Sequence, residues 1–351
     1  MPQAGVIILC HGSRGERGAV EVPETLGRIT EGVKPLLPTG VEVTGAALQF
    51  NRPTLEEAVV ALMARGVPRI VIMPYFLLPG RHITEDIPQL VEKLKDAYRG
   101  IKFTMAKPLG SQEYFIGQVA RCIEEAAPEL WLNTHPSPTP PEDIEQRSMA
   151  IVESLLATTP GIGEKERLVV RRVVHASGDP QVASLLKFGP SAISNGLNAL
   201  ARGSSIFTDV RMVATGINSR LVAACGCSLT CAMAEMEEQE PSKENNTTRA
   251  AAAMYQLGER LNGAIVAIGN APTALLALLD LIDHAQVKPA LVVGMPVGFV
   301  QARESKVELM KRDVPHITVA GTRGGSTIAV ATINALLKVA AERKGITSHK
   351  Q

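Results

Sequence analysis

A short proline-rich segment divides this chain more sharply than any other feature of its sequence. Residues 133–143 read NTHPSPTPPED and hold four prolines within six positions. Proline lacks a backbone N–H donor and its ring blocks a continuing helix, so neither a helix interior nor a central strand fits here. About 130 residues precede the segment and about 210 follow it, enough on each side for a separate hydrophobic core. The sequence therefore predicts domains at residues 1–132 and 142–351, joined by a linker at 133–141.

The composition is that of a globular protein without a strong electrostatic field. The 351 residues include 36 Lys plus Arg and 35 Asp plus Glu, and 45% are hydrophobic. The formal net charge is only +1, too small to attract a polyanion. We therefore expect neither nucleic acid nor a membrane as a partner. The early apolar run GVIILC is too short for a signal-peptide core, and no run reaches the roughly 18 residues of a membrane span. Five cysteines, an odd number, fit reduced thiols and a cytoplasmic location.

Strand-like and helix-like segments alternate through the first part of the chain. Apolar runs lie at 5–10, 41–48 and 69–76, and amphipathic helical patterns at 23–36, 55–65 and 83–98. This alternation predicts an open parallel α/β sheet, in which ligands bind outside the carboxyl ends of the strands. His11 directly follows the first run, and His82 lies in the loop after the third. We expect the two histidines to meet at one mouth of the sheet.

A pair of imidazoles at a sheet mouth indicates a transition-metal site. Neutral imidazole suits divalent cobalt, nickel, iron and zinc, and two ligands leave coordination positions open. A metal ion in transit fits such a pair better than a structural ion does. The alternative is that each histidine is hydrogen-bonded locally in its loop. A nucleotide site is discounted, because Gly12, Gly15 and Gly18 have the spacing G-x-x-G-x-x-G rather than the dinucleotide-binding pattern.

The motifs of this part resemble those of the short sirohydrochlorin cobaltochelatases. They read ILCHGSR, PYFLLPGRHITEDIP and AKPLGS, in that order. The resemblance implies a flavodoxin-like lobe in which His11 and His82 hold the cobalt ion, a substrate, and take protons from the pyrrole nitrogens of sirohydrochlorin. Arg14, Arg52 and Arg81 lie where they could meet the macrocycle's carboxylates, although solvated surface arginine is the commoner explanation. Long members of the family carry two lobes facing one cleft, so a chain with one lobe is expected to work as a homodimer.

The second part opens with two helical patterns, at 142–156 and 164–174. The second pattern is followed by His175, with Gly178 and Pro180 ending the helix soon afterwards. His175 is therefore predicted at or just past a helix C-terminus, where the helix dipole favours the imidazolium form that a general acid needs. The alternative is a histidine that only caps the last carbonyl groups.

Three strand-loop-helix units follow, with loops at 270–273, 295–299 and 322–326. Each loop is expected to place free backbone N–H groups at a helix start, where a carboxylate could bind. The need for tight turns would by itself explain the glycines there. Cys225, Cys227 and Cys231 lack the paired C-x-x-C spacing of zinc sites and have no histidine nearby, so buried thiols are the favoured interpretation.

The second part as a whole resembles precorrin-8X methylmutase, also called cobalt-precorrin-8 methylmutase. Seven motifs occur in the family's order over about residues 142–338: IEQRSMAIVE, VVHASGD, FTDVRMVATGIN, TTRAAAAM, AIGNAPTALLALL, VVGMPVGFVQARESK and TRGGSTIAVATINALL. The resemblance implies a three-layer α/β/α domain with a mainly parallel sheet, which dimerises and moves a methyl group from C11 to C12 of the corrin ring without a cofactor. It implies His175 as the catalytic residue, and Ser148, Thr215 and Arg249 in the substrate pocket.

The two resemblances together imply a bifunctional enzyme of cobalamin biosynthesis, a chelatase fused to a methylmutase. A partner that acts on corrin precursors favours cobalt over iron or nickel, and makes cobalt-precorrin-8 the expected second substrate. Two other functions stay open from the sequence. The second part could carry a corrinoid without converting it, and the first could deliver cobalt as a chaperone without inserting it.

Overall fold

The computed structural model describes residues 2–78, 80–111, 114–128, 140–156, 161–237 and 247–345. The chain forms two compact units, Met1–His135 and Pro136–Gln351, which are described separately. The predicted linker, 133–141, lies outside the described residues except for its last two positions. Pro141 is the first residue of a helix, a place that suits proline because the first-turn N–H groups have no acceptor within the helix. Within the described ranges, no helix has the length and apolar content needed to cross a bilayer.

The first unit is an open sheet of four parallel strands in the order β2-β1-β3-β4. This order confirms the predicted flavodoxin-like fold and adds a fourth strand that the sequence pattern had not indicated. The elements are β1 (Ala4–Cys10), α1 (Glu16–Val33), β2 (Val41–Ala47), α2 (Leu55–Ala64), β3 (Arg69–Pro74), α3 (Ile87–Ala97), β4 (Lys102–Met105) and α4 (Tyr114–Ala126).

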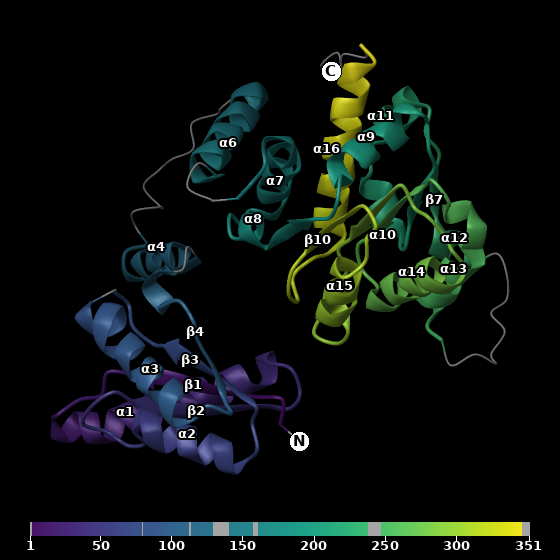
Figure 1. The fold of residues 1–351 in the computed structure, drawn as a ribbon. Coiled ribbons are helices and arrows are strands. Elements are labelled where there is room, and N and C mark those ends of the chain that lie inside the picture. Colours follow the sequence, from purple (N-terminus) through teal and green to yellow (C-terminus); the bar gives the residue numbers. More distant parts are fainter. Residues whose placement is uncertain are drawn as a thin grey trace. The chain divides into compact units, whose positions relative to one another are not determined.

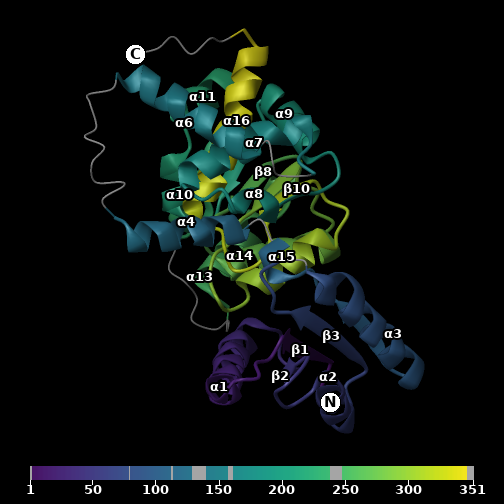
Figure 2. The same ribbon diagram turned by 90° about the vertical axis from the view of Figure 1, so that its left-hand side faces the viewer.

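Different helices cover the two faces of this sheet (Figure 2). Ile7 of β1 joins the core formed with α2 and α3, whereas the next residue, Ile8, packs with Leu26 of α1. Helix α1 begins at Glu16, seven residues before the predicted start, and contains Pro23. The prediction placed the start of the helix at Pro23. Instead Pro23 lies on the exposed face, where water can hydrate the carbonyl group that loses its partner.

The second unit is built on six strands in the order β5-β10-β9-β8-β6-β7. Only the edge strand β5 is antiparallel to its neighbour, so the sheet is mainly parallel, as predicted. Its strands are β5 (Leu186–Phe188), β6 (Ile206–Thr208), β7 (Leu229–Cys231), β8 (Ile265–Ile268), β9 (Leu291–Gly294) and β10 (His316–Val319). Its helices are α6 (Pro141–Leu156), α7 (Glu164–Ser177), α8 (Val182–Leu185), α9 (Ala192–Ala201), α10 (Arg211–Gly216), α11 (Ser219–Cys225), α12 (Ala232–Glu237), α13 (Arg249–Leu257), α14 (Pro272–His284), α15 (Ala302–Met310) and α16 (Ser326–Arg343).

Alternate residues of the central strands supply two separate cores. In β8, Ile265 and Ala267 belong to the core shared with α7, α9 and α16, whereas Val266 and Ile268 belong to the core under α13 and α14. These two helix groups lie on opposite faces of the sheet (Figure 1). A strand buried on both faces is apolar throughout, which is why β8 and β9 read as continuous apolar runs. The predicted three-layer α/β/α architecture is thus confirmed.

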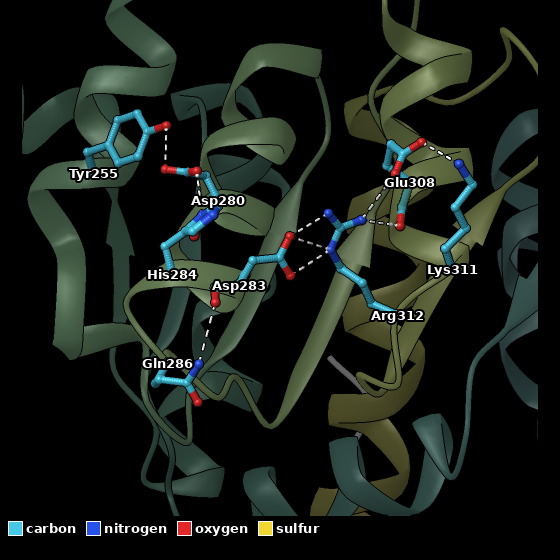
Figure 3. Close-up of polar contacts among 8 residues, drawn as sticks. All are labelled: Tyr255, Asp280, Asp283, His284, Gln286, Glu308, Lys311 and Arg312. Atoms are coloured by element: carbon cyan, nitrogen blue, oxygen red, sulfur yellow. Dashed lines mark hydrogen bonds and ion pairs between the residues drawn. The ribbon is translucent and has the colours of Figure 1, made fainter.

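Charged side chains join the helices at the edge where the parallel strands begin (Figure 3). Arg312, just after α15, donates hydrogen bonds to both carboxylate oxygens of Asp283 on α14, at 2.6 to 3.1 Å. Its Nη1 also donates to the carbonyl of Glu308 at 2.5 Å. On the same helix as Asp283, Asp280 accepts a hydrogen bond from the hydroxyl of Tyr255 at 3.0 Å. These contacts hold one helical layer together at the end of the sheet opposite to the carboxyl ends of its parallel strands.

Candidate active sites

The two predicted histidines of the first unit meet at the mouth of its sheet. The Nε2 atoms of His11 and His82 lie 3.1 Å apart. His11 directly follows β1, and His82 opens a short π-helical turn, His82–Asp86, that leads into α3. Two ring nitrogens this close could bind one divalent ion together and would leave its other coordination positions open.

Asp86 sets the orientation of His82. The Nδ1 atom of His82 lies 2.6 Å from the Asp86 carboxylate, and the Nδ1 atom of His11 lies 3.1 Å from the Gly12 carbonyl. The Gly12 carbonyl can only accept, so the Nδ1 of His11 is the donor there, and the Asp86 carboxylate likewise accepts from the Nδ1 of His82. The two Nε2 atoms face each other across the gap between the rings. A carboxylate behind a metal-binding histidine fixes its tautomer and makes it a better ligand. Sequence reasoning missed Asp86, although its i, i+4 spacing from His82 was visible.

The loop that carries His11 is held by a buried amide, Asn51. Its Oδ1 accepts a hydrogen bond from the Ser13 backbone N–H at 2.8 Å, and its Nδ2 donates to the Gly18 carbonyl at 3.1 Å. Gly12 has a φ of +88°, and a Cβ there would lie 1.8 Å from the Gln49 carbonyl oxygen, so only glycine fits. Asn51 was also missed, because nothing local in the sequence links it to a loop 38 residues earlier.

Arg14 lies beside the same histidine pair. Its guanidinium carbon is 4.5 Å from the ring centre of Phe50, and that ring centre is 6.2 Å from the imidazole of His11. Within the described residues Arg14 has no carboxylate partner, whereas Arg52 and Arg81 pair with glutamates on the surface. An exposed aromatic ring beside an available cation suits a flat, conjugated ligand that bears carboxylates.

The predicted histidine of the second unit opens into a cavity of about 590 Å³. His175 lies in the last turn of α7, which runs three residues further than predicted because Gly178 adopts the left-handed conformation that stops it. Within the described residues no hydrogen bond is made by its imidazole, and the helix end is capped by Ser177 and the Gly178 backbone N–H. The cavity is lined by residues of α6, α7, α10, α11 and α16 and of the turn between α10 and α11. They are Glu145, Arg172, His175, Ala176, Met212, Gly216, Asn218, Leu221, Ser326, Thr327, Val330, Ala331, Asn334, Ala335 and Lys338.

The cavity brings together basic and amide groups that sequence reasoning did not identify. Arg172 donates to the Glu145 carboxylate at 3.0 Å, which joins α7 to α6 at the rim, and Lys338 adds a second cation. The side chain of Asn334 donates to the Gly216 carbonyl at 3.0 Å and accepts from the Asn218 N–H at 2.8 Å. This amide fixes the turn between α10 and α11 against α16. The charge of Arg172 is shared with Glu145, whereas Lys338 has no carboxylate partner among the described residues, and this cation suits a ligand bearing carboxylates.

The other three predicted residues of this unit are near the cavity in sequence but are absent from its lining. Ser148 is half-buried on α6, one turn after Glu145. Thr215 is exposed on α10, next to the lining residue Gly216. Arg249 is exposed at the start of α13, just after residues 238–246, which lie outside the described part of the chain. The structure thus brings His175 to the cavity without those three side chains.

One predicted anion site is already filled by the protein itself. The expectation of free N–H groups in the loop after β8 is wrong, because Asp209 at the end of β6 accepts hydrogen bonds from the N–H groups of Gly269, Asn270 and Ala271 at 2.9 to 3.0 Å. Burial raises the pKa of Asp209, while these backbone donors act in the opposite direction. The loop is therefore fixed by an internal carboxylate and is not available to one from a ligand.

Comparisons with known proteins match the two units separately. The family described as Precorrin-8X methylmutase matches residues 143–339, and the family described as CbiX matches residues 5–126. A cobalt-precorrin-8 methylmutase of Leptospira interrogans is 39% identical over 57% of this chain and 94% of its own length. A precorrin-8X methylmutase of Pseudomonas aeruginosa is 44% identical over 55% of this chain and 93% of its own.

The fold of the second unit is also that of a solved structure. A crystal structure of precorrin-8X methylmutase from Thermus thermophilus has a TM-score of 0.52 and 40% sequence identity. The match covers 57% of this chain and 98% of that one. The likeness therefore extends over nearly the whole of that chain.

Proposed function

This chain belongs to the precorrin-8X methylmutase family and carries a CbiX chelatase unit before it, and from that premise we propose that it inserts cobalt into sirohydrochlorin and isomerises cobalt-precorrin-8. It is a bifunctional enzyme of cobalamin biosynthesis, with lyase and isomerase activities in one chain. The choice of cobalt over nickel or iron rests on the second unit, because methylmutase relatives act on corrin precursors. Of the observations on the first unit, the 3.1 Å approach of His11 to His82 supports the proposal most directly.

For metal insertion, the histidine pair is proposed to hold the ion and to receive protons. A divalent cation entering the macrocycle replaces two pyrrole N–H protons, so the site must both bind the ion weakly and accept protons. Two imidazoles give weak binding with open positions, and the Asp86 carboxylate orients the ring of His82. Arg14 and the Phe50 ring would hold the macrocycle, through a carboxylate and its flat face respectively.

For the methyl shift, His175 is proposed to act on the corrin ring inside the cavity. A shift from C11 to C12 needs electron density drawn away from the migrating terminus, and a proton or hydrogen bond given to the ring supplies this. The imidazole has no protein partner among the described residues, so it can serve a ligand. Arg172 and Lys338 would meet the ring's carboxylates, with Arg249, Ser148 and Thr215 proposed as further contacts outside the present lining.

We further propose that two copies of the chain work together in the cytoplasm. The mouth of the first unit exposes Leu77 and Leu78, with 57% and 78% of their surfaces accessible, and a second lobe would cover such a surface. All five cysteines are unpaired, as fits a reducing compartment. A dimer should appear at about twice the chain mass of 37.4 kDa in light scattering.

Turnover by the full chain tests the proposed function. Incubation with sirohydrochlorin and cobalt, nickel or iron in turn should change the absorbance of the macrocycle most rapidly with cobalt. Incubation with cobalt-precorrin-8 should give the methyl-shifted corrin product. A corrinoid carrier would bind this substrate stoichiometrically and return it unchanged, and a cobalt chaperone would bind cobalt without altering the sirohydrochlorin spectrum. Either result would overturn the corresponding half of the proposal.

A further inference from the structure

Lys306, in the middle of α15, is one of the largest fully buried side chains of the protein. Its Nζ atom donates a hydrogen bond to the backbone carbonyl of Arg323 at 2.5 Å. In the part of the chain that the structure describes, no carboxylate lies within ion-pair distance of it. Desolvation lowers the pKa of Lys306 to about 8. A buried ammonium is costly, and an apolar side chain of similar length would fill the same space without that cost.

The carbonyl that Lys306 holds belongs to the turn between β10 and α16. This turn, 322–325, is pressed against the loop after β9: the Gly325 N–H donates to the Met295 carbonyl at 2.8 Å. A Cβ on Gly324 would lie 2.5 Å from the same carbonyl oxygen, so the two backbones touch. Immediately after the turn, Ser326 and Thr327 begin α16 and line the cavity that contains His175.

The side chain of Arg323 contacts the end of the helix that carries His175. Its Nη1 donates to the Asp179 carboxylate at 2.8 Å, and its Nη2 donates to the Gln181 side chain at 3.2 Å. Asp179 directly follows Gly178, which ends α7. One residue therefore contacts Lys306 through its backbone and the end of α7 through its side chain, while its turn leads into the cavity wall. In Figure 1 α15, β10 and α16 can be followed in chain order through this region.

We propose that Lys306 is a positioning residue for the methyl shift: it fixes the Arg323 turn, and the turn sets the end of α7, with His175, against the first residues of α16. The inference rests on the proposed function of the cavity. It explains why a charged group occupies a core position where an apolar one would be more stable. A purely structural lysine would instead be expected to raise stability and leave catalysis alone.

Three readouts test the role of Lys306 in the full chain: thermal stability, methyl-shift kinetics and hydrogen exchange. Lys306→Met should keep or raise the melting temperature, lower the kcat of the methyl shift tenfold or more and change KM less than threefold. Hydrogen exchange at the Gly325 amide should become at least tenfold faster, since its bond to Met295 is no longer braced. Lys311→Met, which removes an exposed lysine paired with Glu308, is the matched control and should change none of these (Figure 3).

Arg323→Ala removes the contacts of the same turn with Asp179 and Gln181. Because this side chain is exposed, the substitution should not disturb the packing of the core. It should lower kcat to a similar extent, and the Lys306→Met/Arg323→Ala double variant should lose no more than the worse single variant, because both act on one turn. Wild-type kcat in Arg323→Ala, or losses in the two variants that multiply, would overturn the inference. So would a Lys306→Met variant that melts lower and turns over normally.

Failure of the proposed function gives a different pattern. If the unaltered chain does not convert cobalt-precorrin-8, the function of the cavity is wrong, and hydrogen exchange at Gly325 still decides whether Lys306 braces the turn. If the unaltered chain is active and His175→Ala is equally active, the histidine assignment fails whatever Lys306 does. Unchanged exchange at Gly325 in Lys306→Met would exclude the positioning role in either case.

Discussion

The two histidine sites of this protein are built in different ways. In the first unit, one imidazole on a loop and one at the start of a helical turn are brought together by individual polar side chains, chiefly Asn51 and Asp86. In the second, His175 is carried by a helix whose neighbours Val173 and Val174 are buried in the core, and within the described residues its ring makes no hydrogen bond. The first site should therefore be sensitive to single polar substitutions near the histidines. The second should depend on how whole elements are packed.

The largest expected effect is the loss of cobalt insertion, with no loss of the methyl shift, when a histidine of the first site is replaced. His11→Ala and His82→Ala should each lower cobalt insertion more than about 100-fold, because one imidazole cannot both hold the ion and accept protons. Methyl-shift activity of the same variants should stay within twofold of wild type, since the two units have separate cores. Both activities are to be measured on the same preparations. Equal loss of both would show that the sites are coupled and that the comparison is wrong.

The reciprocal prediction concerns His175. His175→Ala should lower kcat of the methyl shift about 100-fold to 10,000-fold, the range for a missing acid–base group, while product corrinoid binds almost as before. Cobalt insertion serves as the internal control and should not change. His175→Asn can donate a hydrogen bond but cannot transfer a proton, so activity retained only in this variant would favour hydrogen bonding. Wild-type turnover by His175→Ala would refute the assignment.

The contrast between the sites also explains what the sequence could reveal. His11, His82 and His175 were identifiable because each stands at the end of a regular element, where periodicity stops. Asp86 was missed because the predicted helix began at residue 83 and left His82 in a loop, whereas the helical turn begins at His82 and brings the two side chains together. The N–H groups after β8 were predicted to be free, but their acceptor, Asp209, comes from about 60 residues earlier. Partners so distant in the chain leave no local pattern.

A third prediction tests the sensitivity of the first site to its polar neighbours. Asp86→Asn should weaken cobalt binding and insertion about 10-fold to 100-fold, as is usual when the carboxylate behind a metal-binding histidine is removed. The matched control is Glu85→Gln, which alters the adjacent carboxylate in an exposed pair with Arg81 and should have little effect. Binding is to be measured by cobalt titration and insertion by absorbance. Equal effects of the two substitutions would indicate a loss of general negative charge instead of a lost orienting bond.

Some strands could be predicted from the sequence and others could not, because the length and burial of a strand decide how clear its pattern is. The central strands β1, β3, β8 and β9 are continuous apolar runs, which follows from burial on both faces. Strands β5, β6 and β7 have only three residues each and were not identified, because so short a run shows no periodicity. Their place in the sheet is fixed by long-range packing.

A fourth prediction uses the buried charge that distinguishes the second site. The pKa of Lys306 is lowered by desolvation to about 8 in the folded chain, against 10.5 for an accessible lysine. Below about pH 8 both states hold the proton, so this residue adds no pH dependence. Between about pH 8 and 10.5 the unfolded state binds more protons, so the unfolding free energy should rise with pH by roughly 3 kcal/mol relative to Lys306→Met. Urea unfolding across this range should show the difference, and parallel curves would mean that the lysine is hydrated.

The smallest effect is expected at the end of the second sheet where the parallel strands begin, away from the His175 cavity. Arg312→Ala removes the paired contacts to Asp283 and should lower the unfolding free energy by roughly 1 kcal/mol, because the ion pair is partly exposed. Hydrogen bonding from Arg312 lowers the pKa of Asp283, so this contribution is present above the unfolded value of 3.8 and is lost as the pH falls through the folded value. Urea midpoints at pH 7 and pH 3 measure the loss of stability and its dependence on pH.

The kcat of the methyl shift should be unchanged in Arg312→Ala. The pair lies where the strands begin, whereas the cavity residues Ser326 and Thr327 follow a strand's end. A fall in kcat without further loss of stability would show that this edge also sets the cavity, and the contrast between the two ends of the sheet would have to be abandoned.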